Sequence, residues 1–191
     1  MHIKANIDDC ALIIQDFLPN ELFKKIKKYN YKHDSNSHDA WQKSLYLDKN
    51  NFTTMKSVNL QEKIAFIENG KIKSKDDIFK EFLEVLINCS FIPFQTNSQI
   101  IISYYEYEKF SGINWHEDGQ YTLNYSFYIH DKWNEDWGGE TLIDTDRGLP
   151  LCCYPEPNSL LTIKSGIKHK VCPVTGPIKR KVLQIRGMFY E

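Results

Sequence analysis

The segments Trp115-His116-Glu117-Asp118-Gly119 and Lys168-His169-Lys170-Val171 contain the three side chains from which the rest of the sequence is best interpreted. In an extended segment, residues i and i+2 project from the same face, so His116 and Asp118 can bind one ion. His169 can complete the site if its segment folds back beside the first. Two imidazoles and one carboxylate can occupy one triangular face of an octahedral Fe(II) ion and leave the opposite face open. The pattern therefore predicts an Fe(II) site with these three ligands.

An H-x-D tripeptide is weak support for a metal site by itself, because short motifs also occur by chance. The alternative interpretation is that three polar residues end strands without binding a metal. Cys172, three residues after His169, is a conceivable alternative ligand, although such a cysteine is more often a small buried apolar side chain. The open face of such a site suits the chemistry of an iron oxygenase.

The length and charge of the chain limit the classes to which it can belong. Its 191 residues suffice for one domain with a sizeable core, so we expect a single domain over 1–191, with helical support in 1–92 and a β-core in 93–191. The chain has 24 lysines and arginines against 25 acidic residues. No nucleic-acid partner is expected, because such partners require a basic surface. The sequence does not indicate an oligomeric state.

The distribution of apolar residues and cysteines indicates the compartment. No apolar run approaches the ~20 residues needed to cross a bilayer, and the amino terminus lacks the apolar stretch of a secretory signal. The five cysteines form no C-x-x-C pair and fit a reducing compartment. We therefore expect a soluble, cytoplasmic protein that has no membrane partner.

Apolar periodicity predicts helices first and strands afterwards. Helices are expected at Glu21–Tyr29, at Leu60–Glu68, ended by Asn69-Gly70, and at Asp76–Asn88, capped by Ser74. A short strand is expected near Trp41–Leu47 within a polar loop. After Pro93, strands are predicted at Gln99–Glu108, Tyr121–His130, Glu140–Ile143, Ser159–Lys164, His169–Val174 and Lys179–Phe189. Helices followed by strands indicate an α+β fold.

Four sequence elements, taken in order, carry a family resemblance. The first runs from Tyr107 through Gly112 to His116-Glu117-Asp118. The second is Phe127-Tyr128-Ile129-His130-Asp131-Lys132-Trp133 followed by Trp137-Gly138-Gly139-Glu140-Thr141. The third joins Pro157-Asn158-Ser159-Leu160-Leu161 to His169-Lys170-Val171-Cys172-Pro173-Val174, and the fourth is Arg180. Over residues 99 to 189 the chain thereby resembles the prolyl-hydroxylase-like branch of the Fe(II)/2-oxoglutarate-dependent oxygenases.

The resemblance implies a fold and a set of ligands. The fold is a double-stranded β-helix, or jelly roll, with helices packed on one sheet. The ligands are Fe(II) and the cosubstrates 2-oxoglutarate and O2, and ascorbate stays open as an addition. Arg180 is expected to bind the far carboxylate of 2-oxoglutarate, because a guanidinium can donate two parallel hydrogen bonds to it. Tyr128 and Tyr107 are expected in the same pocket, and Lys179 is the alternative anchor, since lysine serves this purpose in some relatives.

The chain departs from the family pattern at several positions. Arg186 stands where the family usually has an aromatic residue, and strand alternation puts it on the same face as Arg180. We expect Arg186 to contact an anionic group of the substrate or, with slightly more weight, to form an ion pair at the rim. Trp115 is a further candidate for a substrate contact. His130 replaces a usual asparagine and is interpreted as capping a loop, not as a fourth ligand.

The resemblance implies an enzyme that hydroxylates a prolyl or other peptidyl side chain and forms succinate and CO2. One alternative is the same chemistry on a free amino acid or other small metabolite. Another is a jelly-roll module that binds metal without turnover. A zinc hydrolase with the same three ligands would need a carboxylate base near the bound water, and Glu117 would point away from it in a regular strand.

Overall fold

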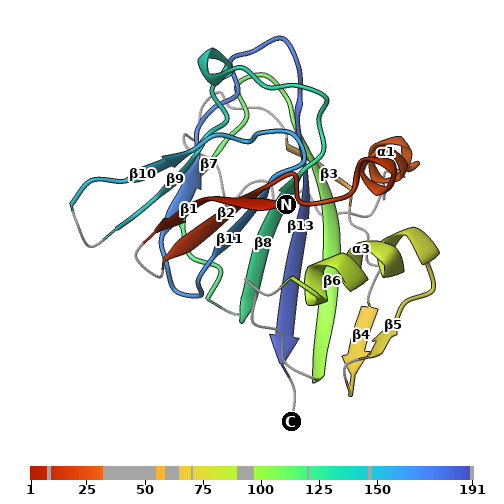
Figure 1. Ribbon diagram of the computed structural model, residues 1–191. Coiled ribbons are helices and arrows are strands. Elements are labelled where there is room, and N and C mark those ends of the chain that lie inside the picture. Colours follow the sequence, from red (N-terminus) through yellow and green to blue (C-terminus); the bar gives the residue numbers. More distant parts are fainter. Residues whose placement is uncertain are drawn as a thin grey trace.

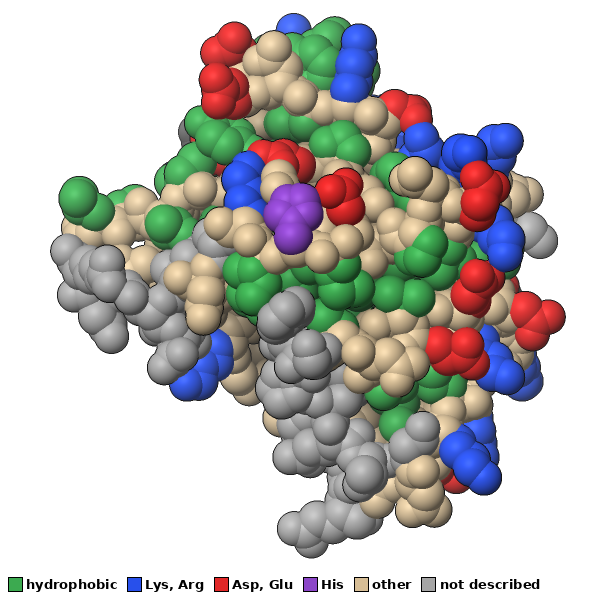
Figure 2. All heavy atoms as spheres, viewed as in Figure 1, with side chains coloured by type: hydrophobic (Ala, Val, Ile, Leu, Met, Phe, Trp, Pro, Cys, Tyr) green, Lys and Arg blue, Asp and Glu red, His purple; other side chains and the backbone are tan. Residues whose placement is uncertain are grey.

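The computed structural model describes residues 1–7, 10–31, 55–58, 65–69, 71–89, 97–119, 121–145 and 148–189. Within these ranges two antiparallel sheets and two α-helices account for most of the chain. No helix in the described ranges combines the length and apolar character needed to cross a membrane. On the face drawn in Figure 2, acidic and basic side chains are interspersed.

The larger sheet has the strand order β1-β2-β11-β8-β13-β6-β4-β5, and β3 also pairs with β6. Its longest pairing joins β13 to β6 over ten residue pairs, from Arg180 opposite Tyr107 to Phe189 opposite Ser98. The strands are β1 (His2–Ile7), β2 (Ala11–Gln15), β3 (Met55–Val58), β4 (Ala65–Glu68), β5 (Lys71–Lys73), β6 (Asn97–Tyr107), β8 (Leu123–Tyr128), β11 (Leu160–Ile163) and β13 (Arg180–Phe189).

The smaller sheet has the order β10-β9-β12-β7, with β7 (Ile113–His116), β9 (Thr141–Ile143), β10 (Leu151–Cys153) and β12 (His169–Val171). Figure 1 shows this sheet on one side of the larger one and both helices on the other. One apolar cluster, which includes Ile143, Leu161, Val171 and Val182, joins the two sheets. The arrangement is a jelly roll with helices packed on one sheet, as predicted.

The two helices cover the outer face of the larger sheet. They are α1 (Asn20–Lys28), which buries Leu22 and Ile26, and α3 (Asp77–Ile87), which buries Phe79, Phe82, Leu83 and Leu86. These side chains belong to a second apolar cluster that also contains Phe127 and Ile185 of the sheet. The α+β class and the helices expected near 21–29 and 76–88 are therefore confirmed. The cap of α3 is Asp76, whose carboxylate accepts the backbone N–H groups of Ile78 and Phe79, and not Ser74.

The helix predicted over Leu60–Glu68 is wrong where the structure describes it, because 65–68 is strand β4. Ala65 and Ile67 are buried and Phe66 is exposed, which is the alternation of a strand. A short apolar run cannot distinguish helix from strand by period alone, and pairing with the edge of β6 decides for strand here. Strands β4 and β5 pair with each other, and the sequence Asn69-Gly70 that stands between them is one that favours hairpins.

The segment 1–92, expected to provide mainly helical support, contains more strands than predicted. The described part of that segment contributes five strands, and β2 lies between β1 and β11 in the larger sheet. Ile13 and Ile14 lie in a strand that pairs with residues about 150 positions later, and no local pattern indicates such a pairing. The strand expected near Trp41–Leu47 lies outside the described residues.

Candidate metal centre

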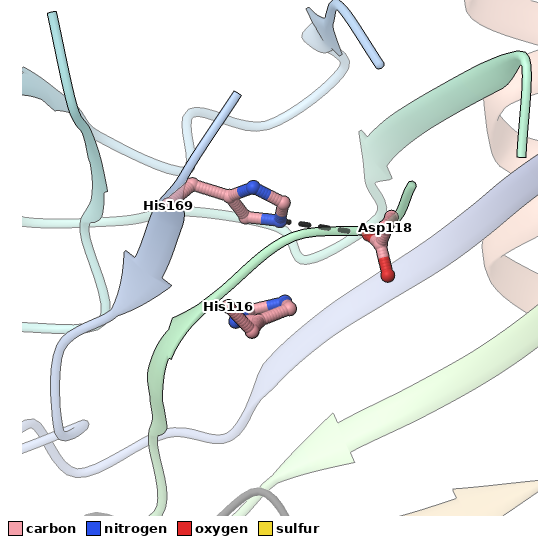
Figure 3. A group of neighbouring side chains, drawn as sticks. All are labelled: His116, Asp118 and His169. Carbon is pink, nitrogen blue, oxygen red and sulfur yellow. Dashed lines mark ion pairs between the residues drawn. The ribbon is translucent and has the colours of Figure 1, made fainter. Parts of the chain in front are cut away.

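The pairing of β7 with β12 brings the two histidines together. His116, the last residue of β7, lies opposite His169, the first residue of β12, and their ring centroids are 4.3 Å apart. Asp118 follows two residues after His116, and one potential ligand atom from each of the three side chains lies within 4.8 Å of the others. Figure 3 shows the two imidazoles and the carboxylate converging from these two segments. The structure thus unites the three residues that the sequence analysis selected.

Both imidazoles are oriented by backbone carbonyl groups. His116 Nδ1 lies 2.7 Å from the carbonyl oxygen of Asn114, and His169 Nδ1 lies 3.0 Å from that of Ile167. A carbonyl oxygen can only accept, so each Nδ1 carries the proton and each Nε2 keeps its lone pair in the neutral ring. This is the tautomer that a metal ligand needs.

The carboxylate of Asp118 is nearly buried and held from several sides. Asn124 Nδ2 donates to Oδ2 at 2.5 Å, His169 Nε2 lies 3.6 Å from Oδ2, and Arg186 Nη2 lies 3.9 Å from Oδ1. Burial raises the pKa of Asp118, but the nearby His169 ring and the charge of Arg186 outweigh it and lower this pKa to about 2. Burial, aided by the neighbouring His169, lowers the pKa of His116. At neutral pH the site therefore offers a charged carboxylate and an uncharged His116.

Arg180 is among the most buried large side chains of the protein. Its Nη2 donates to the hydroxyl groups of Tyr128 and Thr141, each at 3.2 Å, and the guanidinium lies over the rings of Tyr107 and Tyr128. Among the described residues no carboxylate forms an ion pair with it, and its buried Nε has no hydrogen-bond partner there. Burial of a cation without an anion is costly, so this arrangement suits a ligand that brings a carboxylate.

The neighbouring Lys179 lies on the other side of the strand. Its Nζ is 3.0 Å from Glu106 and 3.4 Å from Glu108, and 43% of the side chain is exposed. It does not line the cavity that Arg180 lines. Of the two basic residues considered for the cosubstrate, only Arg180 is therefore directed into the jelly roll. Gly139 leaves room for it, since a methyl group there would come within 3.2 Å of Arg180 Cδ.

One cavity connects the three potential metal ligands with Arg180. Its lining also includes Tyr107, Thr141, Ser126 and Gln184, with Ile163 and Val171 as apolar contacts. Tyr128 lies behind it, 1% exposed. The sequence analysis did not assign roles to Thr141, Ser126, Gln184 or Asn124. Strand alternation could have found the last three, because Ser126 and Asn124 precede Tyr128 by two and four residues and Gln184 follows Arg180 by four.

The two candidate substrate contacts are placed differently. Arg186 lines the cavity, and its Nη1 donates to Tyr105 Oη at 3.1 Å. Its ion pair with Asp118 therefore lies inside the molecule and not at an exposed rim. Trp115 is 42% exposed and does not line the cavity. Lys170 Nζ lies over its ring at 5.6 Å. A substrate would reach Trp115 only if it extended beyond the cavity.

The alternative ligands lie elsewhere. His130 is buried against the loop at Pro155, whose carbonyl oxygen accepts from Nε2, and its Nδ1 accepts the backbone N–H of Lys181. It therefore ties a loop to the sheet, as interpreted from the sequence. Cys172 is not part of the candidate metal group in the described residues, and burial raises the pKa of its thiol to about 12.

Comparison with known families agrees with this geometry. Residues 102–185 match the model of the 2OG-Fe(II) oxygenase superfamily, and this range contains His116, Asp118, His169 and Arg180. This similarity, together with the group formed by His116, Asp118 and His169, supports a dioxygenase that uses Fe(II), 2-oxoglutarate and O2. A sequence search of curated proteins gives no match.

Solved structures with a similar fold include three prolyl hydroxylases. A prolyl-4-hydroxylase from Pseudomonas putida is 14% identical, with a TM-score of 0.60 over 95% of this chain and 93% of that chain. A prolyl hydroxylase from Trichoplax adhaerens, in complex with a hypoxia inducible factor peptide fragment, is 17% identical, with a TM-score of 0.63 over 95% and 84%. A viral collagen prolyl hydroxylase from Paramecium Bursaria Chlorella virus-1 is 13% identical, with a TM-score of 0.58 over 95% and 98%. The resemblance to the prolyl-hydroxylase-like branch is confirmed in fold.

The burial of His130 predicts a pH-dependent stability. Burial lowers its pKa to about 4, whereas an unfolded histidine titrates near ~6.5. Between these values the unfolded chain binds the proton and the folded chain does not, so the free energy of unfolding falls as the pH drops through this window. Between pH 7 and pH 4 the free energy of unfolding should fall by about 3 kcal/mol more in the unmodified protein than in His130→Asn. Urea unfolding at the two pH values measures this difference. The exposed His2→Asn is the control, and equal pH slopes for protein and His130→Asn would contradict the prediction.

Proposed function

We propose that this protein is an Fe(II)- and 2-oxoglutarate-dependent dioxygenase that hydroxylates a prolyl or other peptidyl side chain and releases succinate and CO2. The observation that carries the proposal is a single cavity lined by two histidines, one aspartate and a buried arginine without a carboxylate partner among the described residues. The peptide complex of the Trichoplax adhaerens prolyl hydroxylase, which has a similar fold, supports a peptide as the substrate class.

In this proposal His116, Asp118 and His169 hold Fe(II) through the two Nε2 atoms and a carboxylate oxygen. The donor set fits, since one carboxylate and two imidazoles are the protein ligands of a non-haem Fe(II) site with open positions. Bound there, Fe(II) supplies the activation of O2 that couples decarboxylation of 2-oxoglutarate to hydroxylation of the substrate. The backbone carbonyls at Asn114 and Ile167 keep both rings in the required tautomer before metal binds.

Arg180 anchors the far carboxylate of 2-oxoglutarate, and the hydroxyl groups of Tyr128 and Thr141 orient the guanidinium and the carboxylate. Tyr107 stacks on the guanidinium and remains protonated, since burial raises the pKa of Tyr107 to about 12 even though Arg180 lowers it. Ile163 and Val171 limit access of water. No protein side chain is assigned as a general base, because hydroxylation by an activated iron site does not require one.

The first prediction concerns turnover. Anaerobically purified protein supplied with Fe(II), 2-oxoglutarate and O2 should form succinate, and a prolyl-containing peptide library should stimulate it. His116→Ala should reduce succinate formation by more than about 100-fold. Loss of a direct metal ligand lowers activity more than loss of a residue that only hydrogen-bonds to a ligand. His2→Ala is the control. A protein that binds metal but forms no succinate under any condition would favour the non-catalytic module, and a fully active His116→Ala would exclude the proposed site.

The second prediction concerns the cosubstrate anchor. Arg180→Ala should raise the KM for 2-oxoglutarate by about 30-fold or more, because a buried charge-assisted contact is worth at least about 2 kcal/mol. Lys179→Ala should change this KM by less than about 2-fold, since exposed ion pairs contribute little. Both constants come from succinate formation as a function of 2-oxoglutarate concentration. The reverse ranking of the two variants would make Lys179 the anchor.

A second candidate function is oxidation of a free amino acid or another small carboxylate, and Arg186 favours it. Arg180 and Arg186 are six residues apart on β13, or about 20 Å of strand. Both side chains line the same cavity, and Arg186 lies beside Asp118 there. A small anionic substrate that enters the cavity can contact Arg186, while Trp115 would contact a longer peptide outside the cavity.

The two candidates differ in which compounds stimulate succinate formation. Under the second candidate, free amino acids should stimulate the protein and their carboxamide analogues should not, because the guanidinium prefers a charged carboxylate. Arg186→Leu should lose this distinction. Stimulation by internal peptide sequences alone, with no response to free acids, would reject the small-molecule function and leave the peptide hydroxylase.

A further inference from the structure

A chain of three neutral polar side chains ends on the carboxylate of Asp118. Ser126 Oγ donates to Gln184 Oε1 at 2.9 Å, Gln184 Nε2 donates to Asn124 Oδ1, and Asn124 Nδ2 donates to Asp118 Oδ2 at 2.5 Å. The three side chains come from the adjacent strands β8 and β13, where Ser126 lies opposite Gln184 and Asn124 opposite Arg186. This row of hydrogen bonds therefore spans β8 and β13, which are central strands of the larger sheet.

The direction of every hydrogen bond in this chain follows from the charge at its end. A carboxylate can only accept, so Asn124 must present its amide nitrogen to Asp118. The amide oxygen of Asn124 then faces Gln184, which must present its own nitrogen, and the hydroxyl of Ser126 donates to the remaining oxygen. All three donors are directed towards Asp118, and bonds aligned in this way polarise and strengthen one another.

The surroundings of these hydrogen bonds favour one orientation of the Asp118 carboxylate. Asn124 is 4% exposed, so water competes poorly for its amide. The second oxygen of Asp118 faces the guanidinium of Arg186 at 3.9 Å. With one oxygen held by an amide from β8 and the other attracted by a cation from β13, rotation of the carboxylate about its Cβ–Cγ bond is opposed on both sides.

We propose that Asn124, supported by Gln184 and Ser126, is the positioning residue that sets the orientation of Asp118 and thereby the metal affinity of the site. This inference rests on the proposed role of Asp118 as a metal ligand. Asn124 itself acts through Asp118, and its effect is on metal binding before any cosubstrate or substrate is present.

The test is metal binding by the full chain without turnover. Mn(II), which accepts the same nitrogen and oxygen ligands as Fe(II), is titrated calorimetrically into metal-free protein. Asn124→Leu removes the donor at similar volume and should weaken Mn(II) binding by about 10- to 100-fold. Ser126→Ala, two bonds further away, should weaken it less. Gln99→Leu, which removes an amide from β6 outside the cavity, should leave the affinity unchanged.

A spectroscopic readout separates positioning from a general loss of structure. The visible absorption of the Co(II)-loaded protein reports the ligand geometry, so it should change in Asn124→Leu and remain as in the unmodified protein in Gln99→Leu. If Asn124→Leu does not fold, Gln184→Leu provides the test, because it leaves Asn124 in place and removes the bond that orients its amide, together with the bond from Ser126. Gln184→Leu should then weaken Mn(II) binding and alter the Co(II) spectrum.

The outcomes distinguish this inference from the proposed function. Unchanged Mn(II) affinity and Co(II) spectrum in a folded Asn124→Leu protein, while Asp118→Ala abolishes binding, would overturn the positioning role and leave the metal site intact. Absence of Mn(II) binding by the unmodified protein, or equal binding by Asp118→Ala, would overturn the proposed metal site and this inference together.

Discussion

The antiparallel pairing of β7 with β12 is the contact on which the rest of the site depends. It sets His116 opposite His169, although 53 positions separate them in the sequence, and it brings Asp118 to the same place. The approach is close because Gly112 precedes β7, where a methyl group would lie 2.6 Å from the carbonyl oxygen of Val171. The register of this pairing shifts between His169 and Val171, and both of these end residues of β12 are paired with β7. Without this pairing the three side chains would be unrelated surface groups.

The interior of the jelly roll carries charge where most folds carry only apolar residues. Arg180 is 1% exposed and Arg186 is 9% exposed, and both project from β13 between the two sheets. Such charges are tolerated when hydrogen bonds and anions accompany them. Tyr128, Thr141 and the aromatic rings provide part of this for Arg180, while Asp118 and Tyr105 do so for Arg186. The fold thus keeps two buried cations and one buried anion at defined places, which suits a ligand that is itself anionic.

Strand alternation explains why so much of the site was visible in the sequence. Gln184 and Arg186, at even spacing from Arg180, line the cavity, and so does Ser126, two residues before Tyr128. Lys179, the neighbour of Arg180, lies outside the cavity and pairs with Glu106. The errors arose where the local pattern was short. Ala65–Glu68 is compatible with helix or strand by period, and β2 forms only because β11 is available beside it. The partners of His116, Asp118 and His169 were hidden for the same reason, since backbone carbonyls and Asn124 act through tertiary contacts.

The sequence by itself determined the chemistry: the H-x-D spacing, the later histidine, the arginine and the alternation that assigns each side chain to a face. These properties are local, because residue type and a period of two suffice to state them. Only the tertiary structure decided which of these groups meet, which basic residue is buried, and what orients each ligand. Those outcomes depend on strand register and burial, and both are set by contacts between segments far apart in the chain.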